Sequence, residues 1–200
     1  SLALLWLLGH FANEPAWIAG ELWLSQLMYP WRSPTLTWIM QSISWLGSNQ
    51  ALTLLTVFVV VAPWPARGWA QRGMFLLTAL SASGLNLEMK KWFARSRPGF
   101  EFHPLAEEPL FSFPSGHSML STAIYGFLAY LICFNHRSWG SRPVLAACLL
   151  IGAIGLSRVY LAVHYPGDVL GGFAAGWLCL AVAMALHRRL LGNVNAGEDG

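Results

Sequence analysis

The sequence predicts an all-α membrane protein, a polytopic helix bundle that forms one domain over residues 1–190. Of its 200 residues, 56% are hydrophobic, and the mean hydropathy is +0.49. Only 10% are charged, against about 25% in a typical soluble domain. The apolar residues also gather in blocks that approach the roughly 20 residues, at about 1.5 Å each, with which a helix crosses hydrocarbon.

Five apolar blocks and one shorter leader make up the predicted spans. The blocks cover residues 51–64, 73–89, 119–134, 144–163 and 169–186, and the leader covers residues 2–8. The leader resembles the end of a truncated first span. A cleavable signal peptide with its basic start is a poorer interpretation, because His10, Asn13 and Glu14 follow the leader at once. We therefore expect a bundle of the six-transmembrane-helix type.

The segment between the leader and the first block, residues 12–47, mixes tryptophans with polar side chains. Indole rings favour the headgroup level, where an apolar slab and a hydrogen-bond partner are both present. We expect one or two interfacial helices here, broken at Pro30 and Pro34. The tryptophans are Trp17, Trp23, Trp31, Trp38 and Trp45.

Smaller features add to this picture. Three cysteines lie inside apolar blocks without CxxC spacing, which indicates neither a disulfide framework nor a zinc site. Gly172 and Gly176 have the spacing of a close helix contact. The tail, residues 191–200, is expected to be disordered.

If the helices alternate, one membrane face receives Lys90, the motif FPSGHS, Arg158 and Asp168. Each face then carries six of the 12 basic residues, so charge alone does not orient the chain. If Lys90, Arg97 and Arg158 belong to a site, the positive-inside rule places the C-terminus in the cytoplasm. The site then faces the periplasm or the exterior.

The ionisable residues of that face indicate the chemistry, because charges at the edge of a membrane domain are functional by default. A metal site built on His164 and Asp168 is the first alternative, but three nearby cations would repel a divalent metal. The same cations suit an oxyanion, since guanidinium forks match phosphate oxygens. The cations are Lys90, Arg97 and Arg158.

The motif FPSGHS, residues 113–118, has the features of an anion cradle. Pro114 suits the start of a helix, and Ser115 can cap it or donate a hydrogen bond. Gly116 leaves the backbone N–H groups of that helix end open to phosphate. His117 then serves as a proton donor in the same pocket.

His164 and Asp168 have the spacing of a nucleophile and its orienting carboxylate. The carboxylate bonds one ring nitrogen and leaves the other free to attack phosphorus, which gives a phosphohistidine that water hydrolyses. Other polar residues have simpler interpretations: Lys91 and Arg95 as headgroup anchors, and four further histidines as interfacial or loop residues. These are His10, His103, His136 and His187.

Three signatures in order resemble the type 2 phosphatidic acid phosphatases. They are Lys-x6-Arg-Pro at 90–98, Pro-Ser-Gly-His at 114–117, and Ser-Arg-x5-His-x3-Asp at 157–168. The resemblance implies six membrane helices and a metal-independent phosphatase site at the outer leaflet, without a cofactor. It implies catalysis by His164, His117 and Asp168. It implies phosphate binding by Lys90, Arg97, Ser115, Gly116 and Arg158.

The expected partners are a lipid phosphate and the bilayer, with no nucleic acid. Bacterial members of the family act on undecaprenyl pyrophosphate, phosphatidylglycerol phosphate and phosphatidate, and we expect the substrate in that order, in a bacterial inner membrane. Three alternatives stay open: a lipid phosphotransferase using the same histidine, a vanadate-dependent haloperoxidase, and a lipid-binding protein without activity. The apolar blocks oppose the second, and the complete set of histidines and aspartate opposes the third.

Overall fold

The computed structural model describes residues 2–62, 66, 68–99, 104–106 and 111–198. The described residues form helices and no strand, which confirms the predicted all-α class. Eight are α-helices: α1 (Leu2–Phe11), α2 (Pro15–Gln26), α3 (Pro34–Leu46), α4 (Asn49–Val61), α5 (Trp69–Phe93), α6 (Gly116–Asn135), α7 (Arg142–Tyr160) and α8 (Pro166–Glu198). Two single 3₁₀ turns complete this set: η1 (Tyr29–Trp31) and η3 (Arg137–Trp139).

Proline and serine set several of the helix starts. α2 and α3 begin at prolines, whose fixed φ suits the first helical turn. Ser33 and Ser48 cap α3 and α4 by accepting hydrogen bonds from Leu36 N and Ala51 N, both at 3.2 Å. The chain between α2 and α3 contains Pro30 and ends at Pro34, where the sequence predicts a break.

The predicted number of six membrane spans is supported only in part. Within the described part of the chain, three helices are long and apolar enough to cross a membrane: Gly116–Asn135, Arg142–Tyr160 and Pro166–Leu190. A fourth arises if α3 and α4, which bend by 44° at their junction, count as one broken span. α5 has 25 residues, but Gln71, Arg72, Asn86 and Glu88 are among the polar side chains that lower its hydropathy. Six spans are therefore not confirmed.

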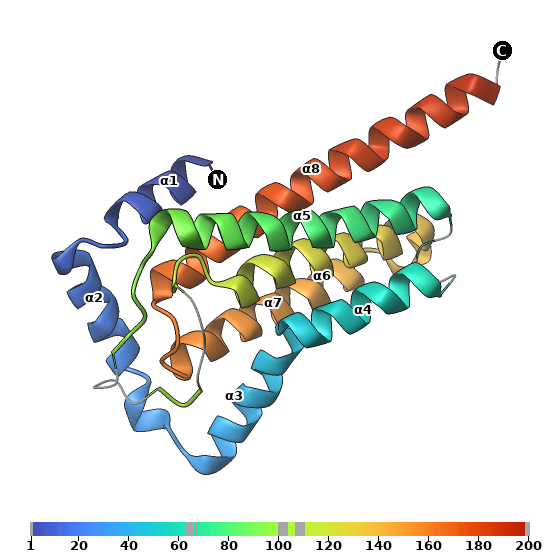
Figure 1. The fold of residues 1–200 in the computed structure, drawn as a ribbon. Helices are drawn as coiled ribbons and strands as arrows, with labels where there is room; N and C mark the ends of the chain where they lie inside the picture. The colour runs from blue at the N-terminus through green and yellow to red at the C-terminus, as the bar shows by residue number, and fades with distance from the viewer. Residues whose placement is uncertain (1, 63–65, 67, 100–103, 107–110, 199–200) are drawn as a thin grey trace.

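α6 is the centre of the bundle and packs against α5, α7 and α8. Figure 1 shows α4 to α8 running side by side, with α1 lying along α8 and with α2 and α3 at one end. Phe75, Phe127 and Leu131 are among the buried core residues. The outer faces carry large apolar side chains such as Leu80, Leu145 and Leu149, each more than 60% exposed. Such surfaces suit a lipid solvent.

The close contact predicted for the two glycines of α8 is confirmed. A Cβ added at Gly172 would lie 2.6 Å from the carbonyl oxygen of Ser115, and one added at Gly176 would lie 2.4 Å from that of Met119. The backbones of α6 and α8 approach each other as small residues allow. This contact holds the start of α8 beside the start of α6.

The C-terminal part of α8 differs in one respect from the sequence prediction. His187 is not an interfacial or loop residue: it is fully buried within the helix, and its Nδ1 lies 3.0 Å from the Tyr130 hydroxyl. The helix extends beyond the apolar block 169–186, so this turn still packs on α6. α8 reaches Glu198 and thus enters the segment 191–200, for which disorder stays a prediction.

Candidate active site

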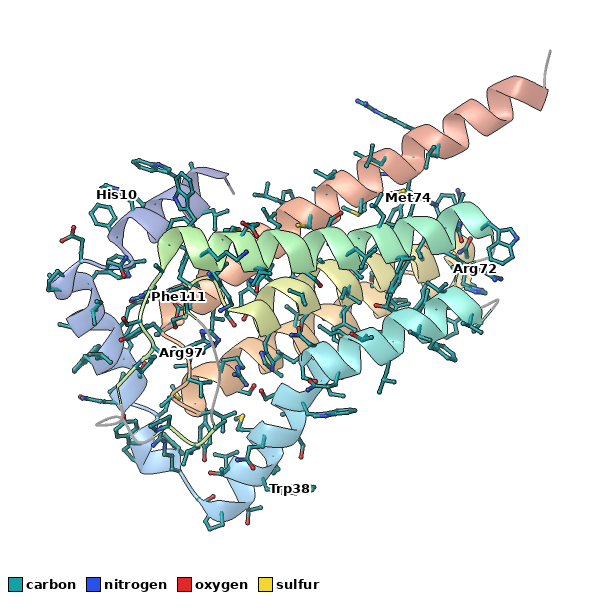
Figure 2. All side chains as sticks on the ribbon, in the orientation of Figure 1. His10, Trp38, Arg72, Met74, Arg97 and Phe111 are labelled. Carbon is teal, nitrogen blue, oxygen red and sulfur yellow. The ribbon has the colours of Figure 1, made fainter. Side chains whose placement is uncertain are left out.

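The predicted site residues lie at or next to the ends of four helices that meet at one end of the bundle. These are the end of α5, the start of α6, the end of α7 and the start of α8. Figure 2 shows Arg97 and Phe111 at this end and Arg72 at the other. The predicted convergence on one face of the bundle is confirmed by the contacts described below.

His164 lies in the short connection between α7 and α8 and is 1% exposed. Its Nδ1 lies 3.4 Å from Oδ2 of Asp168, one helical turn further along the chain. The same Oδ2 accepts a hydrogen bond of 2.9 Å from the backbone N–H of Tyr165. The turn that opens α8 therefore holds the carboxylate against the ring, in the pairing that the spacing predicts.

Ser112 is a third member of this cluster, and the sequence analysis missed it. Its hydroxyl donates a short hydrogen bond to Asp168 Oδ2 and lies 3.3 Å from His164 Nδ1. Its backbone N–H donates to the carbonyl of Arg95 at 2.7 Å. No motif marks this serine, although it directly precedes FPSGHS.

Arg97 occupies the opposite side of the His164 ring. One guanidinium nitrogen donates to the carbonyl of Val163 at 2.7 Å and lies 3.2 Å from His164 Nε2. The second donates to the carbonyl of Phe111 at 3.4 Å. Nδ1 therefore faces a carboxylate and Nε2 faces a cation, so a proton on Nδ1 leaves the Nε2 lone pair directed toward the cationic side.

The surroundings of His164 favour the neutral ring. Burial lowers the pKa of His164 to about 3 and outweighs the hydrogen bond to Asp168, which raises it. The charges of Arg97 and Arg158 lower it further. At neutral pH the imidazole is therefore uncharged, which is the form that a nucleophile requires.

Lys90 lies on the last turn of α5 and is buried. Its Nζ donates a short hydrogen bond to the carbonyl of Phe111 and lies 3.5 Å from that of Ser112. Arg97 shares the Phe111 carbonyl. Two of the three predicted cations are thus held together by one backbone segment.

At the start of α6, Ser115 and Gly116 have separate roles. Ser115 is the N-cap, and its hydroxyl accepts from Ser118 N at 3.5 Å and from the Ser118 hydroxyl at 3.2 Å. Gly116 opens the helix, and a Cβ there would lie 3.0 Å from Asn86 Oδ1. His117 follows on the first turn. The capping contact orients the helix start, where N–H groups and the helix dipole favour an anion.

Arg158 is 2% exposed and approaches the site from α7. It donates a short hydrogen bond to the hydroxyl of Ser44 on α3. Its charge acts on His164. The third cation therefore lies near both histidines and is held by α3.

A cavity of about 440 Å³ contains part of the site and extends between α4, α5 and α6. Five predicted site residues line one end, namely Lys90, Arg97, Gly116, His117 and His164. The rest of its lining is largely apolar and comes from α4, α5 and α6, with Leu52, Val57, Leu76, Leu80, Leu120 and Ile124 among its members. One polar end and one apolar length make the cavity amphipathic.

Arg95 is not a headgroup anchor, which corrects the prediction. α5 continues to Phe93, Ala94 ends it with a left-handed φ of 44°, and Arg95 is buried. Arg95 forms ion pairs with Asp168 at 2.6 Å and, at a shorter distance, with Glu21. Glu21, in α2, is likewise buried. Lys91, by contrast, is exposed and pairs with Glu88.

Comparison with known proteins gives a family for this geometry. The profile of the PAP2 superfamily matches residues 72–191, which include all eight predicted site residues. The chain belongs to the PAP2 superfamily. A phosphatidylglycerophosphatase B of Bacillus subtilis (strain 168) is 37% identical to this PAP2 chain over 163 residues, which are 80% of this chain and 79% of that protein.

Two further comparisons support the family. An Escherichia coli (strain K12) protein named "Putative undecaprenyl-diphosphatase YbjG" is 30% identical over 72% of each chain. A crystal structure of a transmembrane PAP2 type phosphatidylglycerolphosphate phosphatase from Bacillus subtilis superposes with a TM-score of 0.87, at 29% identity and over 94% of each chain. The PAP2 chain is thus an enzyme of a membrane lipid phosphatase family.

Proposed function

We propose that this PAP2 enzyme hydrolyses the phosphate monoester or diphosphate of a membrane lipid through a phosphohistidine on His164. The observation that carries the proposal is the amphipathic cavity. Two histidines and two cations line one end, and the remainder, from three helices, is largely apolar with a minority of polar side chains such as Thr53 and Ser83. A lipid phosphate has the same division, with a charged head and an apolar tail.

The first step is attack on phosphorus by Nε2 of His164. Asp168 accepts a hydrogen bond from Nδ1–H and fixes the tautomer, so the lone pair of Nε2 lies on the side of Arg97. The new N–P bond forms as the P–O bond to the lipid breaks. His117, on the same cavity wall, gives its proton to the departing lipid oxygen.

The cations stabilise the charge that moves through this step. Lys90 and Arg97 line the cavity, and Arg158 adds its charge from behind. Together with the N–H groups at the start of α6, they neutralise the phosphoryl oxygens as charge is redistributed. In the second step His117 takes a proton from water, the water oxygen attacks phosphorus, and the N–P bond breaks. Inorganic phosphate and neutral His164 result.

The proposed reaction uses no metal. Three obligate cations already occupy the positions around the phosphate, and Asp168 is committed to His164 and Arg95. A divalent ion would meet like charges and find few carboxylates. Excess chelator should leave activity unchanged, and loss of activity that magnesium restores would refute this part of the proposal.

Among lipid substrates, we place phosphatidylglycerol phosphate first. The relatives reverse the order that the sequence predicts, since the phosphatidylglycerophosphatase of Bacillus subtilis matches with higher identity and over more of both chains than the undecaprenyl-diphosphatase relative. Undecaprenyl pyrophosphate is second and phosphatidate third. The apolar lining of the cavity suits a lipid tail, but no contact among the described residues distinguishes these three lipids.

We also propose that the site opens outward from a bacterial inner membrane, with the C-terminus in the cytoplasm. Lys90 and Arg158 are buried, and all three cations donate hydrogen bonds within the site, which supports the assumption behind this orientation, namely that Lys90, Arg97 and Arg158 belong to a site. A reporter fused after Leu190 should behave as cytoplasmic. An external reporter would contradict the orientation.

The test of function is phosphate release by detergent-purified protein in excess chelator. The panel contains phosphatidylglycerol phosphate, undecaprenyl pyrophosphate and phosphatidate, each without an added acceptor alcohol and each repeated with His164→Ala. Release by the parent alone supports the proposal, and the ranking identifies the substrate. Release only when an acceptor alcohol is present would instead indicate a phosphotransferase.

A further inference from the structure

We propose that Arg95 and Glu21 are positioning residues for the nucleophile, which act through Asp168 and not on the substrate. The inference rests on the proposed phosphohistidine chemistry and adds two residues that its signatures do not specify: Arg95 stands at a variable position of the first signature, and Glu21 lies outside all three. Glu21 also lies outside the matched family region, in α2. The pair would make this helix, predicted to lie at the membrane interface, a part of the catalytic apparatus.

Arg95 holds the Asp168 carboxylate from behind. One guanidinium nitrogen lies 2.6 Å from Oδ1 of Asp168, and the plane lies over the Tyr165 ring at 4.1 Å. With Oδ1 engaged, Oδ2 is the oxygen presented to Ser112, to Tyr165 N and to His164. A rigid guanidinium fork at 1% exposure fixes the rotation of that carboxylate.

Glu21 holds Arg95 and the start of α8 at the same time. Its Oε2 pairs with the second guanidinium nitrogen of Arg95, and its Oε1 accepts a hydrogen bond of 2.6 Å from the backbone N–H of Gly167. Gly167 immediately precedes Asp168. A Cβ at Gly167 would lie 2.3 Å from Oε1, so this contact requires a residue without a side chain.

The charge of the group also suits the reaction. Arg95 contributes one positive charge, and Glu21 and Asp168 contribute two negative charges, which leaves one net negative charge behind His164. An isolated Arg95–Asp168 pair would be neutral and would give little support to the positive charge that the ring gains on attack. Because Glu21 shares the guanidinium, Asp168 retains its stabilising effect on the phosphorylated ring.

A purely structural salt bridge would predict a different result from a positioning role. A structural bridge affects folding and leaves the turnover of the folded fraction unchanged. A positioning pair lowers kcat with little change in KM, because neither residue lines the cavity in which the substrate binds. The pH profile separates the two roles further.

The experiment measures kcat, KM and the pH profile of phosphate release for folded Arg95→Gln, Arg95→Lys and Glu21→Gln. Glu88→Gln is the matched control, since it breaks an ion pair of α5 that is exposed to solvent. We expect Arg95→Gln to lower kcat by about 10–100-fold, the range for residues that orient a catalytic ligand from behind. Arg95→Lys should recover only part of this loss, because an ammonium cannot hold two carboxylates in the fork geometry.

The acid limb of the pH profile should move to higher pH in one variant only. Loss of the Arg95 charge leaves the two carboxylates uncompensated and favours the protonated ring, so the acid limb of kcat/KM moves to higher pH in Arg95→Gln. Loss of the Glu21 charge acts in the opposite sense, so Glu21→Gln produces no such shift. The other charged groups that face His164 stay in place in both variants; they are Lys90, Arg97, His117, Arg158 and Asp168.

Equal kcat in Arg95→Gln, Glu21→Gln and the Glu88→Gln control would overturn the inference, as would a loss confined to KM. If Arg95→Gln does not fold, Arg95→Lys and Glu21→Gln decide the same question by the same criterion. Failure of the proposed function is distinguishable, because the parent would then release no phosphate or His164→Ala would release as much as the parent.

Discussion

Ser112→Ala tests whether the hydroxyl that the sequence analysis missed contributes to catalysis. Ser112 is fully buried, and its hydroxyl donates to Asp168 Oδ2 beside His164 Nδ1. The variant removes one hydrogen bond to an ionised carboxylate, which is worth about 1.5–3 kcal/mol. Expressed fully in the activation barrier, at about 1.36 kcal/mol per tenfold, this corresponds to a loss of about 10- to 150-fold in kcat.

The contacts that Asp168 keeps in Ser112→Ala indicate that the variant should fold. Asp168 Oδ2 keeps the N–H of Tyr165 at 2.9 Å, and Oδ1 keeps Arg95 at 2.6 Å, so the carboxylate is not left without partners. The effect is therefore expected in the orientation of the carboxylate toward the ring and not in overall stability.

The assay is steady-state phosphate release, with Ser121→Ala as the control. Ser121 is also a fully buried serine of this end of the bundle, but its hydroxyl has no hydrogen-bond partner among the described residues. We expect parental kcat in Ser121→Ala and a loss in Ser112→Ala with KM nearly unchanged. Equal activity of the two variants would refute the assigned role of Ser112.

Three further predictions concern the Asp168 carboxylate, the buried His164 ring and the path of the lipid tail. Asp168→Asn should lower kcat by about 10³–10⁴-fold, because the amide can hydrogen-bond the wrong tautomer of His164; a loss below tenfold in phosphate release would argue against the role. Stability in detergent should fall between about pH 6.5 and pH 3, since the unfolded state binds a proton there that the buried His164 does not. The slope is up to about 1.4 kcal/mol per pH unit, and His164→Gln should flatten it in thermal unfolding. Ala79→Phe should narrow the apolar part of the cavity, where extra side-chain volume typically costs roughly 1–3 kcal/mol. We therefore expect KM to rise about tenfold for long-chain substrates and to stay unchanged for short-chain substrates. Ala146→Phe, on the exposed face of α7, is the control, and an equal KM for long-chain lipid in both variants would exclude this path for the tail.

The site residues that could be predicted from the sequence are those that lie a few positions apart within one signature. One signature contains Lys90 and Arg97, and another contains His164 and Asp168. The alternation of the helices also predicted that the four helix ends carrying the site lie on one face. The additional members are Ser112, Arg95 and Glu21, and each is recognised only by a contact with a residue far away in the sequence. Their contacts join residues 56 to 74 positions apart, and such distances leave no local pattern.

Arg95 shows why a general rule failed. A basic residue after an apolar helix is normally an anchor in the headgroup region, and Lys91 fits that rule. Arg95 does not, because the left-handed Ala94 ends α5 before it and two buried carboxylates compensate its charge. Neither feature has a sequence signal.

The fold was predictable in class and less so in the number of spans. Hydropathy identifies α6, α7 and most of α8, whose apolar faces are continuous. α5 mixes apolar residues with the polar side chains that line the cavity, among them Asn86 and Lys90, so its composition reflects the site as much as the bilayer. α3 and α4 are each too short to span and meet at a bend, which hydropathy does not report.

The most direct test of the account is rapid quenching of a reaction with lipid labelled in its phosphate, followed by location of the label in the protein. The account predicts a phosphoramidate on His164 that is stable in base, labile in acid and absent in His164→Ala. Label on another residue, or a His164→Ala variant that still turns over, would contradict it.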